Sequence, residues 1–251
     1  MTTSTSETAA RTARLDRATA IQLAADEYNR YLDLIRTLTA DDWTHATDCP
    51  AWDVRAMAAH NLGMAEFVTS PEENQRQAGA AATKGGVFID ALTALQVEER
   101  ASMSTDELIE RYAEIAPQAV LGRQYTPDEA RQSNLPMPQT VNGAAEHWTL
   151  GYLLDVILTR DTWMHRVDTC RAIGRPMVLT TEHDGVFIDD VVKEWAARHD
   201  SPYTLVLDGP AGGRWSHGTG GPEYQLDAIE FCRILSGRAI GDGLLKTEVP
   251  F

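Results

Sequence analysis

Apolar residues recur at helical spacing through much of the chain before residue 175. Between Leu15 and Leu38 they are alternately four and three residues apart, which places them on one face of a helix (Ile21, Ala25, Tyr28, Leu32 and Ile35). The same periodicity predicts further helices over Trp52–Val68, Gly86–Arg100 and Ser104–Leu121. Helices that each carry an apolar face bury it against one another, so this part of the chain is expected to be all-helical.

The longest apolar segment of the chain runs from Thr140 to Arg171 and contains no proline. Thr140 can cap the start of a helix, while Gly174 and Pro176 give a stop signal after its end. Apolar residues occupy nearly all sides of this helix between Trp148 and Ile157, which is typical of a buried element. We therefore predict one long central helix over residues 140–171.

Two segments between the predicted helices have no apolar periodicity. Residues Ser70–Lys84 are polar and rich in alanine, glutamine and glycine, which predicts a loop or a mobile lid. Residues Gly122–Gln139 form a long irregular segment that leads into the predicted central helix. Loops of this length inside a compact domain are often functional, so this one could form a wall of a site.

The pattern changes after Pro176. A helix is predicted over Glu182–His199, followed by a strand, a glycine-rich hairpin partner and a short helix (Thr204–Gly209, GRWSHGTGG and Asp227–Leu235), with a further strand possible after Gly243. The Ser/Thr-rich first residues predict a disordered tail. The expected organisation is a tail over residues 1–14, a helical domain over 15–175 and a small α+β domain over 176–251.

Charge and cysteine content narrow the classes of partner. The 251 residues carry a net charge of −15 without any run of lysine or arginine, so neither nucleic acid nor an anionic membrane is an expected partner. Three widely separated cysteines favour a reduced, cytoplasmic protein over a disulfide framework. The N-terminus has no apolar core of a signal peptide, and no apolar run reaches transmembrane length. Both a monomer and a homodimer are compatible with these features.

The C-terminal half of the predicted central helix carries Asp161, His165 and Asp168. Spacings of four and three residues place them on one helical face. Buried charges are unfavourable unless they are paired or bind a cation. Two interpretations follow, a metal site or a hydrogen-bonded pair on a half-exposed face.

Three stretches resemble one known family. They are W-T-H-A-T-D-C-P-A-W-D-V-R-A-M-A-A-H (Trp43–His60), D-T-W-M-H-R-V-D with the following G-R-P (Asp161–Pro176), and L-D-G-P-A-G-G-R-W with the later I-L-S-G-R that ends at Arg238. On these motifs the chain resembles the mycothiol-dependent maleylpyruvate isomerase family of the DinB-like metal-binding superfamily. The resemblance implies a mainly α fold, in which a DinB-like four-helix bundle is followed by a small α+β C-terminal domain.

The same resemblance implies a divalent metal, usually zinc, held by His60, Asp161 and His165. The family usually has glutamate where Asp161 stands. Three protein ligands leave a fourth position open, as in catalytic zinc sites. Asp168 would orient a ligand histidine, or would form an ion pair at the helix end. Arg238 matches the family's arginine after S-G and would contact a substrate carboxylate, unless it is a surface arginine.

The function implied by the resemblance is a zinc-dependent enzyme that activates the low-molecular-weight thiol mycothiol as its cosubstrate. The thiol would attack a small electrophilic substrate. If the thiol leaves again the enzyme is an isomerase, and if it stays on the product the enzyme is an S-transferase. The alternative is a DinB-like protein that binds a metal or a small ligand without catalysis.

Overall fold

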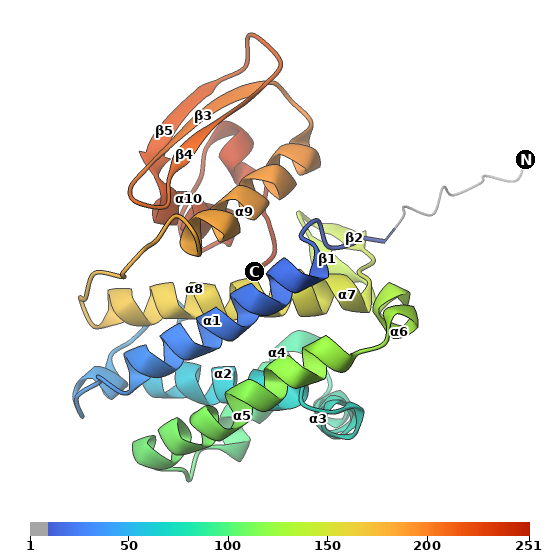
Figure 1. The fold of residues 1–251 in the computed structure, drawn as a ribbon, viewed down its shortest axis with the longest axis vertical. Helices are drawn as coiled ribbons and strands as arrows, with labels where there is room; N and C mark the ends of the chain where they lie inside the picture. The colour runs from blue at the N-terminus through green and yellow to red at the C-terminus, as the bar shows by residue number, and fades with distance from the viewer. Residues whose placement is uncertain (1–9) are drawn as a thin grey trace, which may run out of the picture. The chain divides into compact units, whose positions relative to one another are not determined.

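The computed structural model describes residues 10–251, which form two compact units (Figure 1). The bundle unit comprises Arg17–Tyr125 and Leu158–Leu179. The mixed unit comprises residues 10–16, Thr126–Ile157 and Thr180–Phe251. The predicted boundary at residue 175 lies close to the end of the bundle unit. Residues 126–157 lie within the predicted helical domain, but their contacts group them with the C-terminal residues.

Four helices make up the centre of the bundle unit: α1 (Arg17–Ile35), α2 (Val54–Phe67), α5 (Thr105–Tyr125) and α8 (Leu158–Ala172). Helices α1 and α2 each pack against both α5 and α8, and Figure 1 shows the four side by side. The largest side chains of this core are fully buried (Tyr31, Ile35, Met57, Leu62, Leu108, Tyr112 and Trp163). The predicted mainly α fold with a four-helix bundle is therefore confirmed.

The predicted loop over Ser70–Lys84 is wrong, because this segment forms the helix α3 (Pro71–Lys84). Ser70 caps it by accepting a hydrogen bond from the Glu73 amide, and Pro71 occupies its first position. Helix α4 (Phe88–Glu99) packs against both α2 and α3. A short 3₁₀ turn, η1 (Asp42–Thr44), lies between α1 and α2.

The predicted helix over residues 140–171 is wrong in its first third. This part of the chain forms a hairpin instead, in which β1 (Gln139–Val141) pairs antiparallel with β2 (Ala144–Glu146). Its turn residues Asn142 and Gly143 have φ angles of 52° and 74°, and Asn-Gly is the dipeptide that two-residue hairpin turns favour. The capping residue is Thr149, followed by α7 (Leu150–Tyr152), a π-helical turn η2 (Leu153–Ile157) and α8.

The predicted loop over residues 122–139 is partly helical. Helix α5 extends to Tyr125, and α6 (Asp128–Gln132) follows after two residues. The remaining residues up to β1 have no regular structure apart from an isolated bridge between Asn134 and Thr149. The irregular part is therefore much shorter than the sequence suggested.

The mixed unit contains a three-stranded sheet in the order β4 (Gly213–His217), β3 (Tyr203–Asp208), β5 (Glu223–Asp227). Strand β3 runs antiparallel to β4 and parallel to β5. Helices α9 (Asp184–His199) and α10 (Ala228–Leu235) pack on it through the buried Trp195, whose ring contacts Tyr203 and Phe231. The strand expected after Gly243 is instead a 3₁₀ turn, η3 (Gly243–Lys246).

The N-terminal tail was predicted over residues 1–14. Residues 1–9 lie outside the described residues. Arg11 does not fit the predicted disordered tail, because its amide donates to the carbonyl of His147 and its carbonyl accepts from the amide of Thr149. Over residues 10–251, none of the helices has the length and apolar character needed to cross a membrane.

Candidate metal centre

The loop before α2 fixes where this helix begins. The amide of Val54 donates to the carbonyl of His45, and the side chain of Asp53 caps the helix by accepting from the Ala56 amide at 2.7 Å. His60 follows two helical turns after Asp53, and its side chain is almost fully buried. The capped start therefore places the imidazole of His60 inside the bundle unit.

Helix α8 brings two further candidate ligands to the same place. Asp161 and His165 lie one turn apart, with His165 Nε2 3.2 Å from Asp161 Oδ1. From α2, His60 Nε2 approaches the second oxygen, Asp161 Oδ2, to 3.3 Å. One donor atom from each of the three residues lies within 4.8 Å of the other two. The structure thus brings together all three residues predicted as metal ligands.

This donor set fits a divalent cation. Zinc binds nitrogen and oxygen at about 2.0–2.1 Å, so tetrahedral ligand atoms stand roughly 3.3 Å apart, close to the two separations found here. Asp161 Oδ2 is buried and accepts no hydrogen bond from any described residue, although His60 Nε2 is near it. A buried carboxylate oxygen without a donor is a position where a cation would supply the missing interaction.

The three groups strongly affect one another's charge. Burial by itself raises the pKa of Asp161, but the neighbouring His165 and His60 outweigh it and hold this pKa well below its ordinary value. Burial lowers the pKa of His165, whereas Asp161 and Asp168 together raise it to about 9. Asp161 is therefore a carboxylate at neutral pH, and a bound cation would replace the proton between it and the imidazoles.

Asp168 lies on the other side of His165. Its Oδ2 is 3.1 Å from His165 Nδ1, and its side chain is fully buried. The Cys49 thiol also points to Asp168 Oδ2, at 3.9 Å. Asp168 thus contacts the ring nitrogen that faces away from Asp161, the position expected of a residue that orients a ligand histidine.

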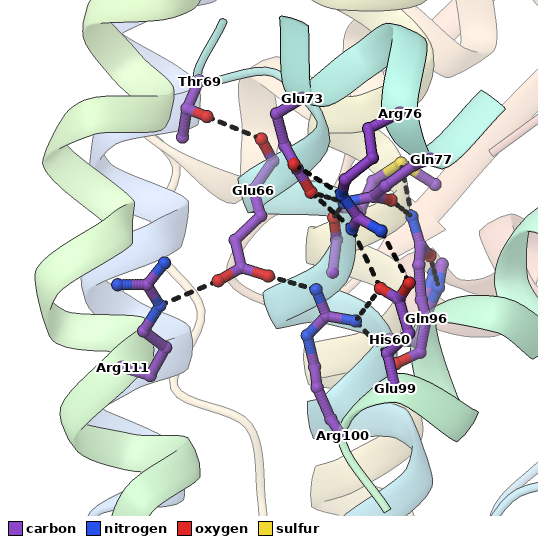
Figure 2. Close-up of polar contacts among 12 residues, drawn as sticks. His60, Glu66, Thr69, Glu73, Arg76, Gln77, Gln96, Glu99, Arg100 and Arg111 are labelled. Atoms are coloured by element: carbon purple, nitrogen blue, oxygen red, sulfur yellow. Dashed lines mark hydrogen bonds and ion pairs between the residues drawn. The ribbon is translucent and has the colours of Figure 1, made fainter. Parts of the chain in front are cut away.

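Two residues at this centre were not singled out from the sequence. The ring of Trp52 packs against His60 and His165, with centroid separations of 4.8 and 5.8 Å. It belongs to the C-P-A-W stretch of the family motif, which was the available signal. Gln96 on α4 accepts a hydrogen bond from His60 Nδ1 at 2.8 Å (Figure 2), and nothing in its sequence context marked it.

Arg238 belongs to the mixed unit, whereas the three candidate ligands belong to the bundle unit. It follows α10, where its amide donates to the carbonyl of Arg233 after Gly237 with φ 79°. Its side chain is half-buried. Its predicted contact with a substrate carboxylate stays a prediction.

Comparison with known proteins adds a family and a fold. A family profile described as "Mycothiol maleylpyruvate isomerase N-terminal domain" matches residues 24–170, more than half of the chain. A crystal structure of the mycothiol-dependent maleylpyruvate isomerase shares the fold with a TM-score of 0.57 at 16% identity, over 94% of this chain and 95% of that one. A histidine-to-alanine mutant of that enzyme gives 0.54 at 14% identity, over 90% of both chains. No curated protein sequence matches significantly.

Proposed function

Because the chain belongs to the mycothiol maleylpyruvate isomerase family, we propose that it is a metal-dependent enzyme that uses mycothiol to attack a small electrophile. The observation that carries the proposal is the convergence of His60, Asp161 and His165, with a buried Asp161 oxygen that lacks a hydrogen-bond donor. Both reaction types remain part of the proposal, isomerisation if the thiol leaves and S-transfer if it stays on the product.

Zinc or a similar divalent cation bound here would lower the pKa of a thiol in its fourth position and so supply a thiolate at neutral pH. The chain's residues hold and shield the site. His60, Asp161 and His165 provide the ligand atoms, and Asp168 orients His165 through Nδ1. The indole of Trp52 packs against both imidazoles.

We further propose that Arg238 binds a carboxylate of the substrate. Its guanidinium can form two parallel hydrogen bonds to a carboxylate, which would orient the substrate as well as attract it. The proposal rests on the match of I-L-S-G-R to the family motif. An Arg238→Lys variant, which keeps the charge but loses the paired geometry, is expected to raise KM for a carboxylate substrate more than for an uncharged electrophile.

Metal analysis and adduct mass spectrometry together test the function. Purified protein should hold close to one equivalent of a divalent metal, and His60→Ala should lose it while the exposed control His217→Ala keeps it. Mycothiol and glutathione are then compared across maleylpyruvate and simple electrophiles. Metal binding without either turnover or mycothiol adducts would favour a non-catalytic binding protein, and wild-type protein without metal would overturn the proposal.

A further inference from the structure

The second ring nitrogen of His60 points away from the candidate metal centre. While Nε2 faces Asp161, Nδ1 lies 2.8 Å from Gln96 Oε1. Gln96 comes from α4, and its side chain has no exposed surface. A histidine can offer Nε2 to a cation only if that nitrogen carries no proton, so the group at Nδ1 bears on metal binding.

The contact between His60 and Gln96 is the first in a series that Figure 2 shows leading away from His60. Gln96 Nε2 donates to Gln77 Oε1 at 3.0 Å. Gln77, on α3, is also fully buried, and its Nε2 donates both to Glu73 Oε1 at 2.9 Å and to the Gly63 carbonyl at 3.1 Å. A series of hydrogen bonds between side chains of α2, α4 and α3 therefore connects the imidazole of His60 to the carboxylate of Glu73.

The series has a fixed direction because one end can only accept hydrogen bonds. Hydrogen bonds from Arg76 lower the pKa of Glu73, so Glu73 is a carboxylate at neutral pH. Gln77 must then turn its amide nitrogen towards Glu73, which leaves its oxygen to accept from Gln96. Gln96 in turn presents its own oxygen to His60, and only a protonated Nδ1 can donate to it.

The surroundings of Glu73 keep this end of the series charged. Glu73 lines a surface cleft of about 660 Å³. Arg76 bridges Glu73 and Glu99, and Glu66 accepts from both Arg100 and Arg111. The three arginines of the cleft are thus paired with its carboxylates, so we infer no ligand for the cleft itself.

Close packing between α2 and α4 gives Gln96 its place. Gly63 lies one turn after His60, and a Cβ there would stand 2.6 Å from both Cβ and Cγ of Gln96. Only glycine lets the two helices approach so closely at this point. The same residue supplies the carbonyl that Gln77 bonds, so Gly63 helps to position both glutamines.

We propose that Gln96, held by Gln77 and Glu73, is a positioning residue that keeps the proton of His60 on Nδ1 and so presents Nε2 to the metal. The inference rests on the proposed metal site. It assigns a role to Gln96, Gln77 and Glu73, none of which is proposed to contact the cation. These residues act on the metal site only through the ring of His60.

Zinc affinity, measured by competition with a chromophoric chelator, is the first test. Gln96→Met and Gln96→Glu both lose the bond to Gln77, so both are expected to lower folding stability. Only Gln96→Met also loses the acceptor for His60 Nδ1. We expect its zinc Kd to rise roughly 10- to 100-fold, whereas that of Gln96→Glu, which keeps an acceptor at Nδ1, should not rise. Gln118→Met, on the exposed side of α5, is the control.

Nitrogen-15 NMR of the His60 ring tests the proton position directly, even if Gln96→Met does not fold. In zinc-loaded wild-type protein, Nδ1 should carry the proton and Nε2 should be the metal-bound nitrogen. Zinc on Nδ1, or equal Kd values for wild type and Gln96→Met, would overturn the role of Gln96 while leaving the metal site intact. A wild-type protein that binds no zinc would overturn both proposals.

Discussion

Asp168 and His165 form a buried pair one helical turn apart on α8, with Asp168 Oδ2 3.1 Å from His165 Nδ1. Together with the bond from His60 Nδ1 to Gln96, this gives each candidate ligand histidine a hydrogen-bonding partner on the ring nitrogen that faces away from Asp161. The two partners differ in charge, a carboxylate for His165 and an amide for His60. A carboxylate makes the imidazole a stronger donor of electrons to a metal.

Removing Asp168 should therefore weaken metal binding although Asp168 is not proposed as a ligand. We expect Asp168→Ala to raise the zinc Kd by about 10- to 100-fold, and Asp168→Asn, which still offers an oxygen to Nδ1, to raise it less. Chelator competition measures both. Asp33→Asn, at an exposed position on α1, is the control. Unchanged affinity in Asp168→Ala would leave Asp168 with a purely structural role.

The length of the acidic ligand is a second testable feature. Glutamate carries the same carboxylate on a side chain one methylene longer, so Asp161→Glu should still bind one equivalent of metal after a small shift of the longer side chain. Asp161→Ala should lose the metal, because it removes the oxygens that face His60 and His165. Metal content after gel filtration separates the two variants. Equal metal content in Asp161→Ala and wild type would exclude Asp161 as a ligand.

Trp52 should stabilise the site mainly by packing. Replacing a large aromatic ring by alanine in a core costs about 3–5 kcal/mol, and the half-buried position of Trp52 places Trp52→Ala near or below the lower end of that range. Trp52→Phe retains a ring over the imidazoles and should cost clearly less. Urea denaturation of the metal-free proteins gives both values. A loss of stability below about 1 kcal/mol for Trp52→Ala would contradict the packing role.

The ion pairs of Arg76 with Glu73 and Glu99 should make folding stability depend on pH. Hydrogen bonds from Arg76 lower the pKa values of Glu73 and Glu99 below those of the unfolded chain. The stabilisation is therefore present above the unfolded pKa of 4.5 and is lost as the pH falls through the lower, folded-state values. All three side chains are partly exposed, so we expect Arg76→Met to cost only about 1 kcal/mol at pH 7.

Unfolding free energies of metal-free wild type and Arg76→Met, measured between pH 7 and pH 3, test this expectation. The two curves should converge at the acid end, because protonated Glu73 and Glu99 no longer interact with the Arg76 charge. Working without metal removes the separate effect of acid on metal release. Parallel curves over the whole range would show that Arg76 does not stabilise these carboxylates.

The sequence by itself determined the helices with a clear apolar face and the pair on α8. Residues four apart on a helix lie on the same side regardless of their surroundings. Helix formation alone therefore makes Asp161 and His165 neighbours. The apolar faces of α1, α2, α4 and α5 are likewise local patterns. The predictions are wrong where a local signal points to another structure, as at Asn142-Gly143 within the predicted central helix and at the Ser70-Pro71 start of α3.

Only the tertiary structure decided which polar residues lie inside the protein. Glutamine is usually exposed to solvent, yet packing of α3 and α4 against α2 buries both Gln77 and Gln96. A buried side-chain amide needs a hydrogen-bonding partner, which here comes from another helix. The spacing of residues within one helix does not indicate where that partner lies. The approach of His60 to Asp161, which spans about a hundred residues of sequence, depends on the same packing.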